Sequence, residues 1–184
     1  MTTHSALWRR LDTPGHDACR LAGTEHGWEL AGTAVFRHHG EAVRLSYRLA
    51  CDPAWHARRG EVRGFVGADA VDLAVERTAS GAWNFDGRAC PGLEGCTHLD
   101  LGFTPATNLP QLRQLALQVG DAADLPVAWL DVPPSDLLVL PQRYERRSEE
   151  AYWYEAPSVG YAAVLELAPS GFVRRYPGLW VIED

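Results

Sequence analysis

The sequence contains no long apolar run, which excludes a membrane protein built from spanning helices. No stretch approaches the roughly 20 apolar residues that a helix needs to cross a bilayer. Residues 1–10 also lack the apolar segment typical of a secretion signal. We therefore expect a cytoplasmic protein without a transmembrane segment.

A basic charge balance is absent as well, because the 184 residues carry a formal net charge of −7. Proteins that bind nucleic acids usually present a basic patch or stripe, so we expect no nucleic-acid partner. The anionic surface of a membrane would also repel the chain on average.

Cysteine is scarce and lacks the spacing of a metal or redox site. No CxxC pair occurs among the four cysteines, which are Cys19, Cys51, Cys90 and Cys96. We expect them to be reduced and to act as small buried side chains. A disulfide between Cys90 and Cys96 is the alternative. The pair His38 and His39 has no suitably spaced carboxylate or histidine nearby, so we predict neither a metal nor a cofactor.

Enzyme signatures are missing too. The sequence has no G-x-S-x-G nucleophile elbow, no P-loop and no dinucleotide-binding glycine pattern. One cluster, His98, Asp100, Asn108 and Arg113, contains the residue types of acid–base catalysis, and a hydrolase-like enzyme that uses it is the alternative hypothesis. A solvated strand face followed by a helix cap explains the same residues, so we do not predict an enzyme.

The composition that remains is that of an ordinary globular domain. With 46% hydrophobic and 22% charged residues, the chain is expected to form one domain over residues 1–184. Seven tryptophans stand against a single methionine. Tryptophan and tyrosine combine a large apolar area with one polar group, which suits an amphiphilic binding surface. Filling a curved β core is an equally good explanation.

Alternating polarity predicts a mainly β fold. The clearest strand spans 42–49, where Val43, Leu45, Tyr47 and Leu49 share one face and arginines share the other. About fourteen short strands at hairpin spacing are expected along the chain, with one helix. The pattern favours a mostly antiparallel sheet that is rolled or closed as a barrel.

The stretch 93–119 departs from this pattern. Residues 97–103 alternate as a strand with one buried face, which would leave His98 and Asp100 on the solvated face. A helix is predicted over 107–119, with Thr107 or Asn108 as its cap and Gly120 ending it. Its apolar stripe is formed by Leu109, Leu112, Leu115, Ala116 and Val119. We expect Leu112 and Leu115 to be buried; a further strand is the competing interpretation.

The segment GCTHLDLGFTPATNLPQLRQL resembles the signature of the family described as "Putative glycolipid-binding". The PATN motif is its most specific part. Weaker matches follow the family's order over nearly the whole chain: WHAR from Trp55, GAW ending at Trp83, QRY from Gln142, YWY from Tyr152, and GFVRRYPG from Gly171. The chain departs from the family pattern at His98, where an acidic residue is usual, at Pro110, which lies one place early, and at Gln114, which replaces a second arginine.

The resemblance implies a spiral β-roll, a long antiparallel sheet curled around one principal helix. It also implies a non-catalytic binding protein for an amphiphile such as a glycolipid. The candidate ligand-binding residues are Trp55, Arg58, Trp83, Asp100, Asn108, Arg113, Gln142 and Tyr144. The arginines would hold a carboxylate or phosphate, the amides would bond hydroxyls, and the aromatic rings would stack on the ligand. A third class is a structural protein whose edge strands form a homodimer.

Overall fold

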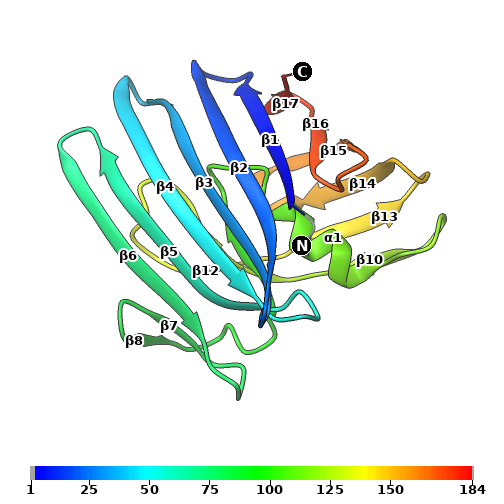
Figure 1. Ribbon diagram of the computed structural model, residues 1–184, viewed down its shortest axis with the longest axis horizontal. Coiled ribbons are helices and arrows are strands. Elements are labelled where there is room, and N and C mark those ends of the chain that lie inside the picture. The colour runs from blue at the N-terminus through cyan, green and yellow to red at the C-terminus, as the bar shows by residue number, and fades with distance from the viewer. Residues whose placement is uncertain (1–2, 184) are drawn as a thin grey trace.

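The computed structural model describes residues 3–183, in which a mainly β chain carries a single α-helix (Figure 1). The first eight strands follow one another as a meander: β1 (Thr3–Arg10), β2 (Gly15–Thr24), β3 (Gly27–His38), β4 (Glu41–Cys51), β5 (Ala57–Val66), β6 (Asp69–Arg77), β7 (Trp83–Phe85) and β8 (Arg88–Cys90). The middle of the chain forms β9 (Leu99–Leu101), α1 (Asn108–Leu115), β10 (Ala122–Asp124), β11 (Val127–Leu130) and β12 (Leu138–Leu140). The last part forms β13 (Arg143–Arg146), β14 (Ala151–Ala156), a 3₁₀ turn (Pro157–Val159), β15 (Tyr161–Leu167), β16 (Val173–Tyr176) and β17 (Trp180–Ile182).

Fourteen strands join into one antiparallel sheet in the order β10-β13-β14-β15-β16-β17-β1-β2-β3-β4-β5-β6-β7-β8. The prediction of a large antiparallel sheet is therefore confirmed. A sheet of this width curls, because the twist of its strands accumulates. Its edge strands β10 and β8 do not pair, so within the described residues the sheet is open and the expected barrel-like closure is not observed.

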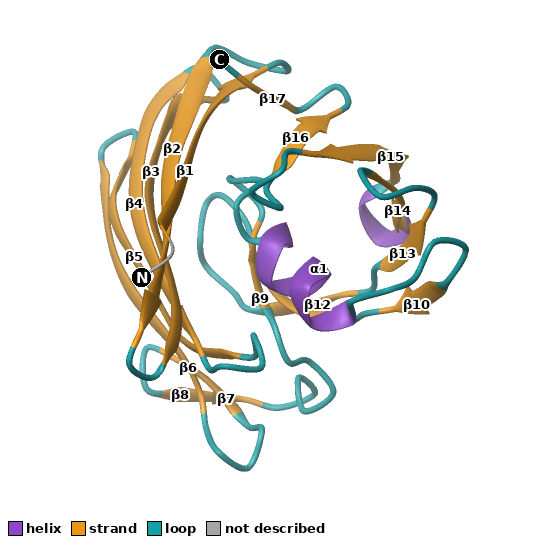
Figure 2. Ribbon diagram, turned by 45° about the vertical axis from the view of Figure 1, so that its right-hand side comes forward, coloured by secondary structure: helices purple, strands orange, loops and turns teal. Residues whose placement is uncertain are grey.

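The large sheet has two arms, which meet where β1 pairs with β17 (Figure 2). We call β1–β8 the N-terminal arm and β10 with β13–β17 the C-terminal arm. Figure 2 shows the N-terminal arm as a broad curved wall and α1 inside the curve of β13–β16. A second, three-stranded sheet, β12-β11-β9, includes a parallel pair, β9 and β11, which the sequence did not predict. Parallel neighbours need a long crossover, and the chain through α1 and β10 supplies it.

The inner face of the N-terminal arm is apolar, as the alternation in 42–49 predicted. Val43, Leu45, Tyr47 and Leu49 are buried on β4, whereas Arg44 and Arg48 are exposed. Leu99 of β9 packs against the same wall at Gly60 of β5, where an added Cβ would overlap the leucine Cδ2 atom. The core therefore lies between this arm and the small sheet.

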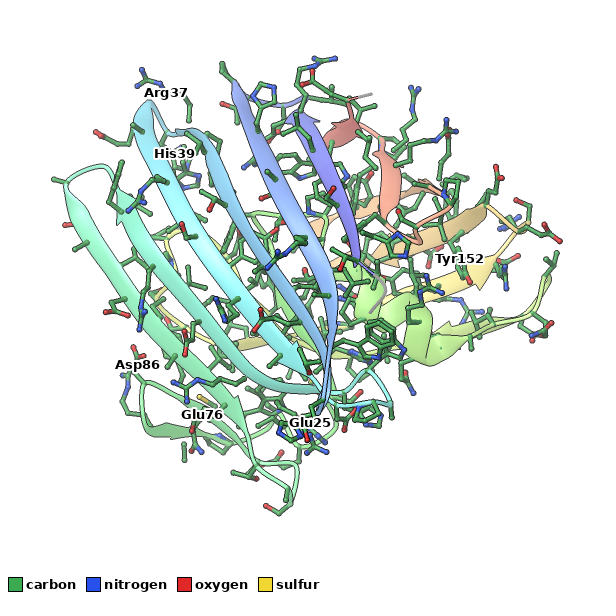
Figure 3. The ribbon with its side chains drawn as sticks, viewed as in Figure 1. Glu25, Arg37, His39, Glu76, Asp86 and Tyr152 are labelled. Atoms are coloured by element: carbon green, nitrogen blue, oxygen red, sulfur yellow. The ribbon has the colours of Figure 1, made fainter. Side chains whose placement is uncertain are left out.

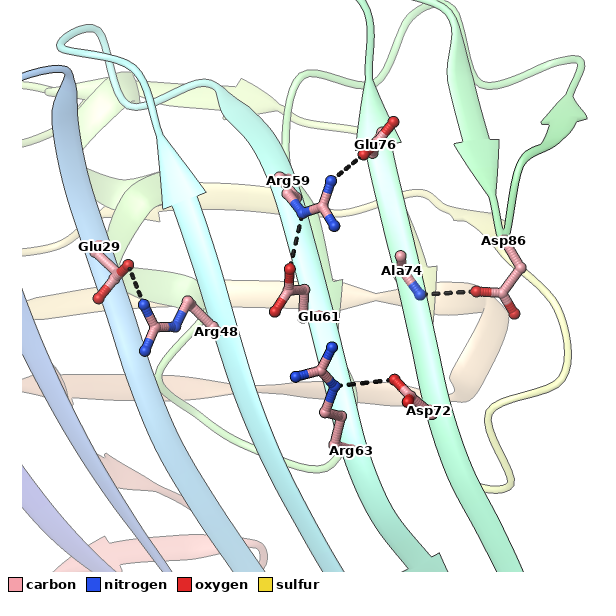
Figure 4. A network of polar contacts seen from close by, with 9 residues as sticks. All are labelled: Glu29, Arg48, Arg59, Glu61, Arg63, Asp72, Ala74, Glu76 and Asp86. Atoms are coloured by element: carbon pink, nitrogen blue, oxygen red, sulfur yellow. Dashed lines mark hydrogen bonds and ion pairs between the residues drawn. The ribbon is translucent and has the colours of Figure 1, made fainter.

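The outer face of the N-terminal arm is a lattice of ion pairs (Figure 4). Arg48 contacts Glu29 at 3.1 Å, and Arg63 contacts Asp72 at 2.9 Å. Arg59 contacts both Glu61 and Glu76. Exposed pairs of this kind contribute only about 0–1 kcal/mol each, so the lattice sets the polarity of this face more than its stability.

The predicted helix is present but shorter than expected. It spans Asn108–Leu115 rather than 107–119, because Ala116 adopts a left-handed conformation with φ 45° and donates its N–H to Leu112 O. The following residues leave the helix to contact β13, where Arg146 donates to Leu117 O. Leu112 is buried as predicted, whereas Leu115 is only half-buried, so its predicted full burial was wrong.

The prediction of a capping side chain was also wrong. Thr107 occupies the N-cap position but makes no capping hydrogen bond. Its hydroxyl donates to Asp100 instead and accepts from the Leu101 N–H. Asn108 donates its amide to Tyr144. Tertiary partners therefore take both side chains that could have capped the helix.

His98 and Asp100 are buried, and their predicted position on a solvated face was wrong. β9 is covered on one side by the N-terminal arm and on the other by α1 and its neighbours, so neither face reaches solvent. The alternation predicted a strand over 97–103, which is observed only over Leu99–Leu101, and it did not predict the second covering layer.

The four cysteines are all unpaired; Cys19, Cys51 and Cys96 are buried and Cys90 is half-buried.

Candidate functional site

A cavity of about 320 Å³, the central cavity, lies between the two arms and beside the start of α1. Its walls are largely apolar and aromatic. They are formed by Phe36, Phe103, Trp129, Val132, Leu140, Tyr154, Ala156, Val159, Tyr161, Tyr176, Leu179 and Trp180. Its polar lining consists of Arg10, His38, Asp100, Thr104, Asn108 and Asp131. The cavity therefore combines a hydrophobic wall with a small number of polar groups, which is the usual composition of a small-molecule site.

The TPATN segment forms one side of the cavity and is fixed to the N-terminal arm. Thr104 Oγ1 accepts from the Ala106 N–H at 3.0 Å, which closes the turn, and its hydroxyl donates to Asp17 of β2. Tyr47 of β4 donates to the same Asp17 oxygen at 2.9 Å. Burial raises the pKa of Asp17 to about 6, against the opposing effect of these hydrogen bonds. The motif is thus held by a buried carboxyl that sequence spacing did not reveal.

Asp100 organises the inner end of the cavity. Its Oδ1 atom accepts from Thr107 at 2.9 Å, and its Oδ2 atom accepts from Gln142 at 2.6 Å and Gln111 at 3.3 Å. Burial raises the pKa of this carboxyl above its usual value and outweighs the three hydrogen bonds, which lower it. No cation contacts Asp100 among the described residues, so only these three hydrogen bonds offset the unfavourable burial of its charged form.

The network continues from Asp100 to the C-terminal arm. Tyr144 of β13 donates to Gln111 Oε1 at 2.8 Å and accepts from Asn108 Nδ2 at 2.8 Å. All these side chains are buried, and burial raises the pKa of the Tyr144 hydroxyl well above its usual value. Buried polar groups are costly unless they are paired, so this network fixes the geometry of the inner end.

Three tyrosines of neighbouring strands form the aromatic wall. The ring centroids of Tyr154 and Tyr176 lie 5.7 Å apart, and those of Tyr161 and Tyr176 lie 5.1 Å apart. On β14 the buried side chains alternate as Tyr152, Tyr154 and Ala156. The small Ala156 side chain follows Tyr154 on the same face, and this step from a large to a small residue leaves space for the cavity.

Gly102 keeps the side of the cavity next to β11 open. Asp100 pairs with Trp129 in the parallel register of β9 and β11, and Gly102, in the turn just after β9, donates its N–H to Leu130 O of β11 at 2.9 Å. A Cβ atom added to Gly102 would lie 2.8 Å from both Trp129 Nε1 and Asp131 Oδ1. Any larger residue at this position would therefore have to displace one of these side chains.

The structure places only part of the predicted site at the cavity. Asp100 and Asn108 line it, and Gln142 and Tyr144 support them from behind through hydrogen bonds. Trp83 is buried away from the cavity, where its indole N–H donates to Cys96 O at 3.0 Å, and it forms part of the core of the N-terminal arm.

The other predicted ligand contacts lie in different places. Trp55 stacks on Trp28 with centroids 4.3 Å apart, and Arg58 pairs with Asp52 at 2.7 Å. Arg113 donates to Ser170 O and lines a separate depression of about 470 Å³, the Arg113 groove, rather than pairing with Asp100. The members of the proposed acid–base cluster therefore lie in three places: Asp100 and Asn108 at the cavity, Arg113 at the groove, and His98 beside neither.

His98 also lies away from the cavity. Its ring centroid is 6.3 Å from that of His56, and its Nε2 atom is 3.5 Å from Gln114 Oε1. Burial lowers the pKa of His98 to about 4. A neutral histidine therefore stands where the family pattern has an acidic residue.

Several residues of the cavity were not predicted from the sequence. They are Arg10, Phe36, His38, Asp131, Tyr161, Tyr176 and Trp180. Tyr176 belongs to the GFVRRYPG match and could have been selected on that ground. The others are single residues at strand ends whose meeting depends on the curl of the sheet, which no local pattern encodes.

Comparisons with known proteins agree with this description. A crystal structure of a DUF1089 family protein from Pseudomonas aeruginosa is similar to the chain, with a TM-score of 0.70 and 27% sequence identity over 98% of this chain and 92% of that one. A search among curated proteins gives no match. Within residues 3–183, the one α-helix is too short and too polar to cross a membrane. The model of the family described as "Putative glycolipid-binding" matches residues 5–181. The chain belongs to this family.

Proposed function

We propose that the protein is a non-catalytic binding protein for an amphiphilic ligand, such as a glycolipid. One observation carries the proposal: the central cavity has apolar, aromatic walls and a buried polar network at its inner end. Such a cavity is suited to a molecule with both an apolar and a polar part. The family description points in the same direction. The proposal includes a spiral β-roll, in which the open curl of the sheet gives access to the cavity.

The volume of the cavity limits what it holds. About 320 Å³ corresponds to roughly ten water molecules at about 30 Å³ each. This is near the lower end of the range for small-molecule sites. One sugar ring or a short acyl segment fits, so the rest of a larger amphiphile would extend outside.

The environment of Asp100 supports binding over catalysis at the inner end of the cavity. A general acid or base must reach the substrate, yet both oxygens of Asp100 are occupied by protein donors. The cavity contains no serine or cysteine among its lining residues. We therefore assign Asp100 a structural role at the inner end.

A cavity-filling substitution tests the proposal. Gly102→Val should obstruct the cavity and weaken binding of an alkyl glycoside at least tenfold, measured by tryptophan fluorescence and by calorimetry. Gly95→Val is the matched control, because Gly95 has no atoms near its added Cβ position and lies outside the cavity. Equal loss in both variants, or no saturable binding by the unmodified protein of glycolipids, fatty acids or alkyl glycosides, would refute the proposal. Turnover of a lipid ester would replace it with an enzyme.

A further inference from the structure

We propose that the Arg113 groove is a second binding site, which takes a doubly charged anion of the phosphate class, either inorganic phosphate or the phosphate of a monoester. The groove has a volume of about 470 Å³ and shares no lining residue with the central cavity. It lies beside the last turn of α1, whereas the cavity lies beside the first turn. An anion can therefore bind in the groove whether or not an amphiphile binds in the cavity.

Arg113 brings the first positive charge to the groove. Its side chain is exposed in the last turn of α1, and its Nη2 atom donates to Ser170 O at 2.9 Å. Gly171 leaves room for the guanidinium, because a Cβ atom added there would lie 2.9 Å from Nη2 and 3.2 Å from Nε. Within residues 3–183, Arg113 forms no ion pair, and its Nε and Nη1 atoms make no hydrogen bond. A carbonyl oxygen thus holds this guanidinium in place without neutralising it.

Arg146 of β13 brings a second charge that is also not neutralised. Its guanidinium donates only to main-chain carbonyl oxygens: Nη1 to Leu117 at 2.7 Å, Nε to Ser148 at 3.2 Å and Nη2 to Glu149 at 3.2 Å. By contrast, the arginines of the outer ion-pair lattice contact carboxylates (Figure 4). Two fixed cations without counter-ions therefore border one groove, which is the arrangement that recognises a phosphate.

Tyr152 of β14, labelled in Figure 3, adds a neutral donor to the groove. The centroid of its ring lies 5.7 Å from Arg146 Cζ. Burial raises the pKa of its hydroxyl, and the charges of Arg146 and Arg113 oppose that rise, which places both guanidiniums close to it. The hydroxyl makes no hydrogen bond within the described residues, so it can donate to a bound anion.

The number of donors favours a phosphate over a carboxylate. A carboxylate carries one negative charge and matches one guanidinium, whereas a phosphate monoester carries about 1.5–2 negative charges at pH 7 and has three acceptor oxygens. Two arginines and a tyrosine match that charge and those acceptors. The apolar part of the lining can contact the organic part of a monoester, and it consists of Leu112, Ala116, Leu167, Ala168 and Pro169.

Glu149 and Glu150 are the opposing charges of the groove, on the exposed turn between β13 and β14. Within residues 3–183, neither carboxylate forms an ion pair with Arg113 or Arg146. The net charge of −7 also repels anions at long range. Water and salt screen such exposed charges, so their repulsion is weaker than the attraction of donors that touch the anion.

Calorimetry with the full chain at about pH 7 tests the charge class, because a phosphate is close to its doubly charged form there. The probes are inorganic phosphate, butyl phosphate and acetate. We expect saturable binding of both phosphates, about tenfold tighter than acetate, and weaker binding when the salt is raised from about 50 to about 500 mM. Equal or tighter binding of acetate, an affinity that does not depend on salt, or no saturable binding of either phosphate would overturn the inference.

Two matched variants locate the anion. Arg113→Gln removes an exposed charge and should weaken butyl phosphate binding roughly tenfold, since one charge-assisted hydrogen bond is lost. Arg143→Gln is the control, because Arg143 is also exposed but pairs with Asp124 and lies outside the groove. It should leave the affinity unchanged, and an equal loss in both variants would reject the site. Tyr152→Phe keeps every charge and should weaken binding about threefold.

Vesicle sedimentation distinguishes a lipid head group from a free phosphate compound. Phosphatidic acid carries a phosphate monoester, so vesicles of phosphatidylcholine are compared with and without it. Co-sedimentation that needs phosphatidic acid and is lost in Arg113→Gln supports the site with a lipid head group as its ligand. Binding of butyl phosphate without co-sedimentation supports it with a free phosphate compound. Arg113→Gln should leave alkyl glycoside binding in the central cavity unchanged, and loss of both activities together would reject a separate second site.

Discussion

Asp17 should make the stability of the protein depend on pH. It is 1% exposed on β2, and its Oδ2 atom accepts from Tyr47 and Thr104. Its Oδ1 atom has no hydrogen-bond partner among the described residues. An ionised carboxylate with one unpaired buried oxygen is unfavourable, which is consistent with a pKa raised from 3.8 to about 6.

The size of the effect follows from the difference between these two values. Between pH 3.8 and about 6 the folded chain binds this proton more tightly than the unfolded chain does. The stabilisation is therefore complete below pH 3.8 and is lost as the pH rises through about 6. A shift of about two units corresponds to roughly 3 kcal/mol of unfolding free energy.

Asp17→Asn removes this titration while preserving the shape of the side chain. Its amide oxygen can still accept from Tyr47 and Thr104. We expect the difference in unfolding free energy, variant minus unmodified protein, to rise by roughly 3 kcal/mol between pH 4 and pH 7 and to stay constant above pH 7. Urea denaturation at each pH, followed by fluorescence, measures the difference, in which the titrations of the other groups cancel.

An exposed control distinguishes burial from a general charge effect. Asp72→Asn removes a carboxylate that pairs with Arg63 on the outer face, and the change should stay below about 1 kcal/mol. If the Asp17→Asn difference is flat with pH, or grows toward acid, the carboxylate is stabilised in the fold and the reasoning from burial is wrong.

Two further outcomes follow from buried groups. Burial lowers the pKa of His98 from 6.5 to about 4, so its contribution to stability is present above pH 6.5 and is lost as the pH falls through about 4. In the same urea series, His98→Gln should therefore reduce the unfolding free energy lost between neutral and acid pH by roughly 3 kcal/mol. Tyr144→Phe leaves a buried donor and a buried acceptor unpaired, and at about 1–3 kcal/mol each we expect a loss of roughly 2–6 kcal/mol of unfolding free energy. A loss below about 1 kcal/mol would mean that water replaces the hydroxyl.

Structural features that depend on a local sequence pattern were predictable. The buried face of β4 follows from strict alternation in 42–49, and the existence of α1 follows from its leucine spacing and Pro110. The C-terminal end of α1 was not predictable, because the chain after Leu115 contacts β13, where Arg146 donates to Leu117 O. Local sequence cannot show a partner that lies some thirty residues further on.

The candidate site was predictable where the family motif passes through it. Asp100 and Asn108 belong to that motif and line the cavity. Arg58 and Arg113 were chosen for their charge, and each is occupied by a partner outside the cavity, Asp52 and the Ser170 carbonyl. The chemistry of a side chain alone does not identify a site residue, because its position in the fold and its partners decide whether it faces the cavity.

The width of the strand pairing changes sharply along the large sheet. Three residue pairs join β1 to β17, and two join β16 to β17, whereas eleven join β3 to β4. β15 and β16 are also joined by only two pairs, so the narrow region runs from β15 through β17 to β1. Local opening costs least where few backbone hydrogen bonds must break, so we expect amide hydrogen exchange to be faster in this region than in β3 and β4. The central cavity borders the narrow region through Tyr161, Tyr176 and Trp180. If the protein binds an amphiphile as proposed, this is the part of its wall that would yield most easily to a ligand larger than the cavity.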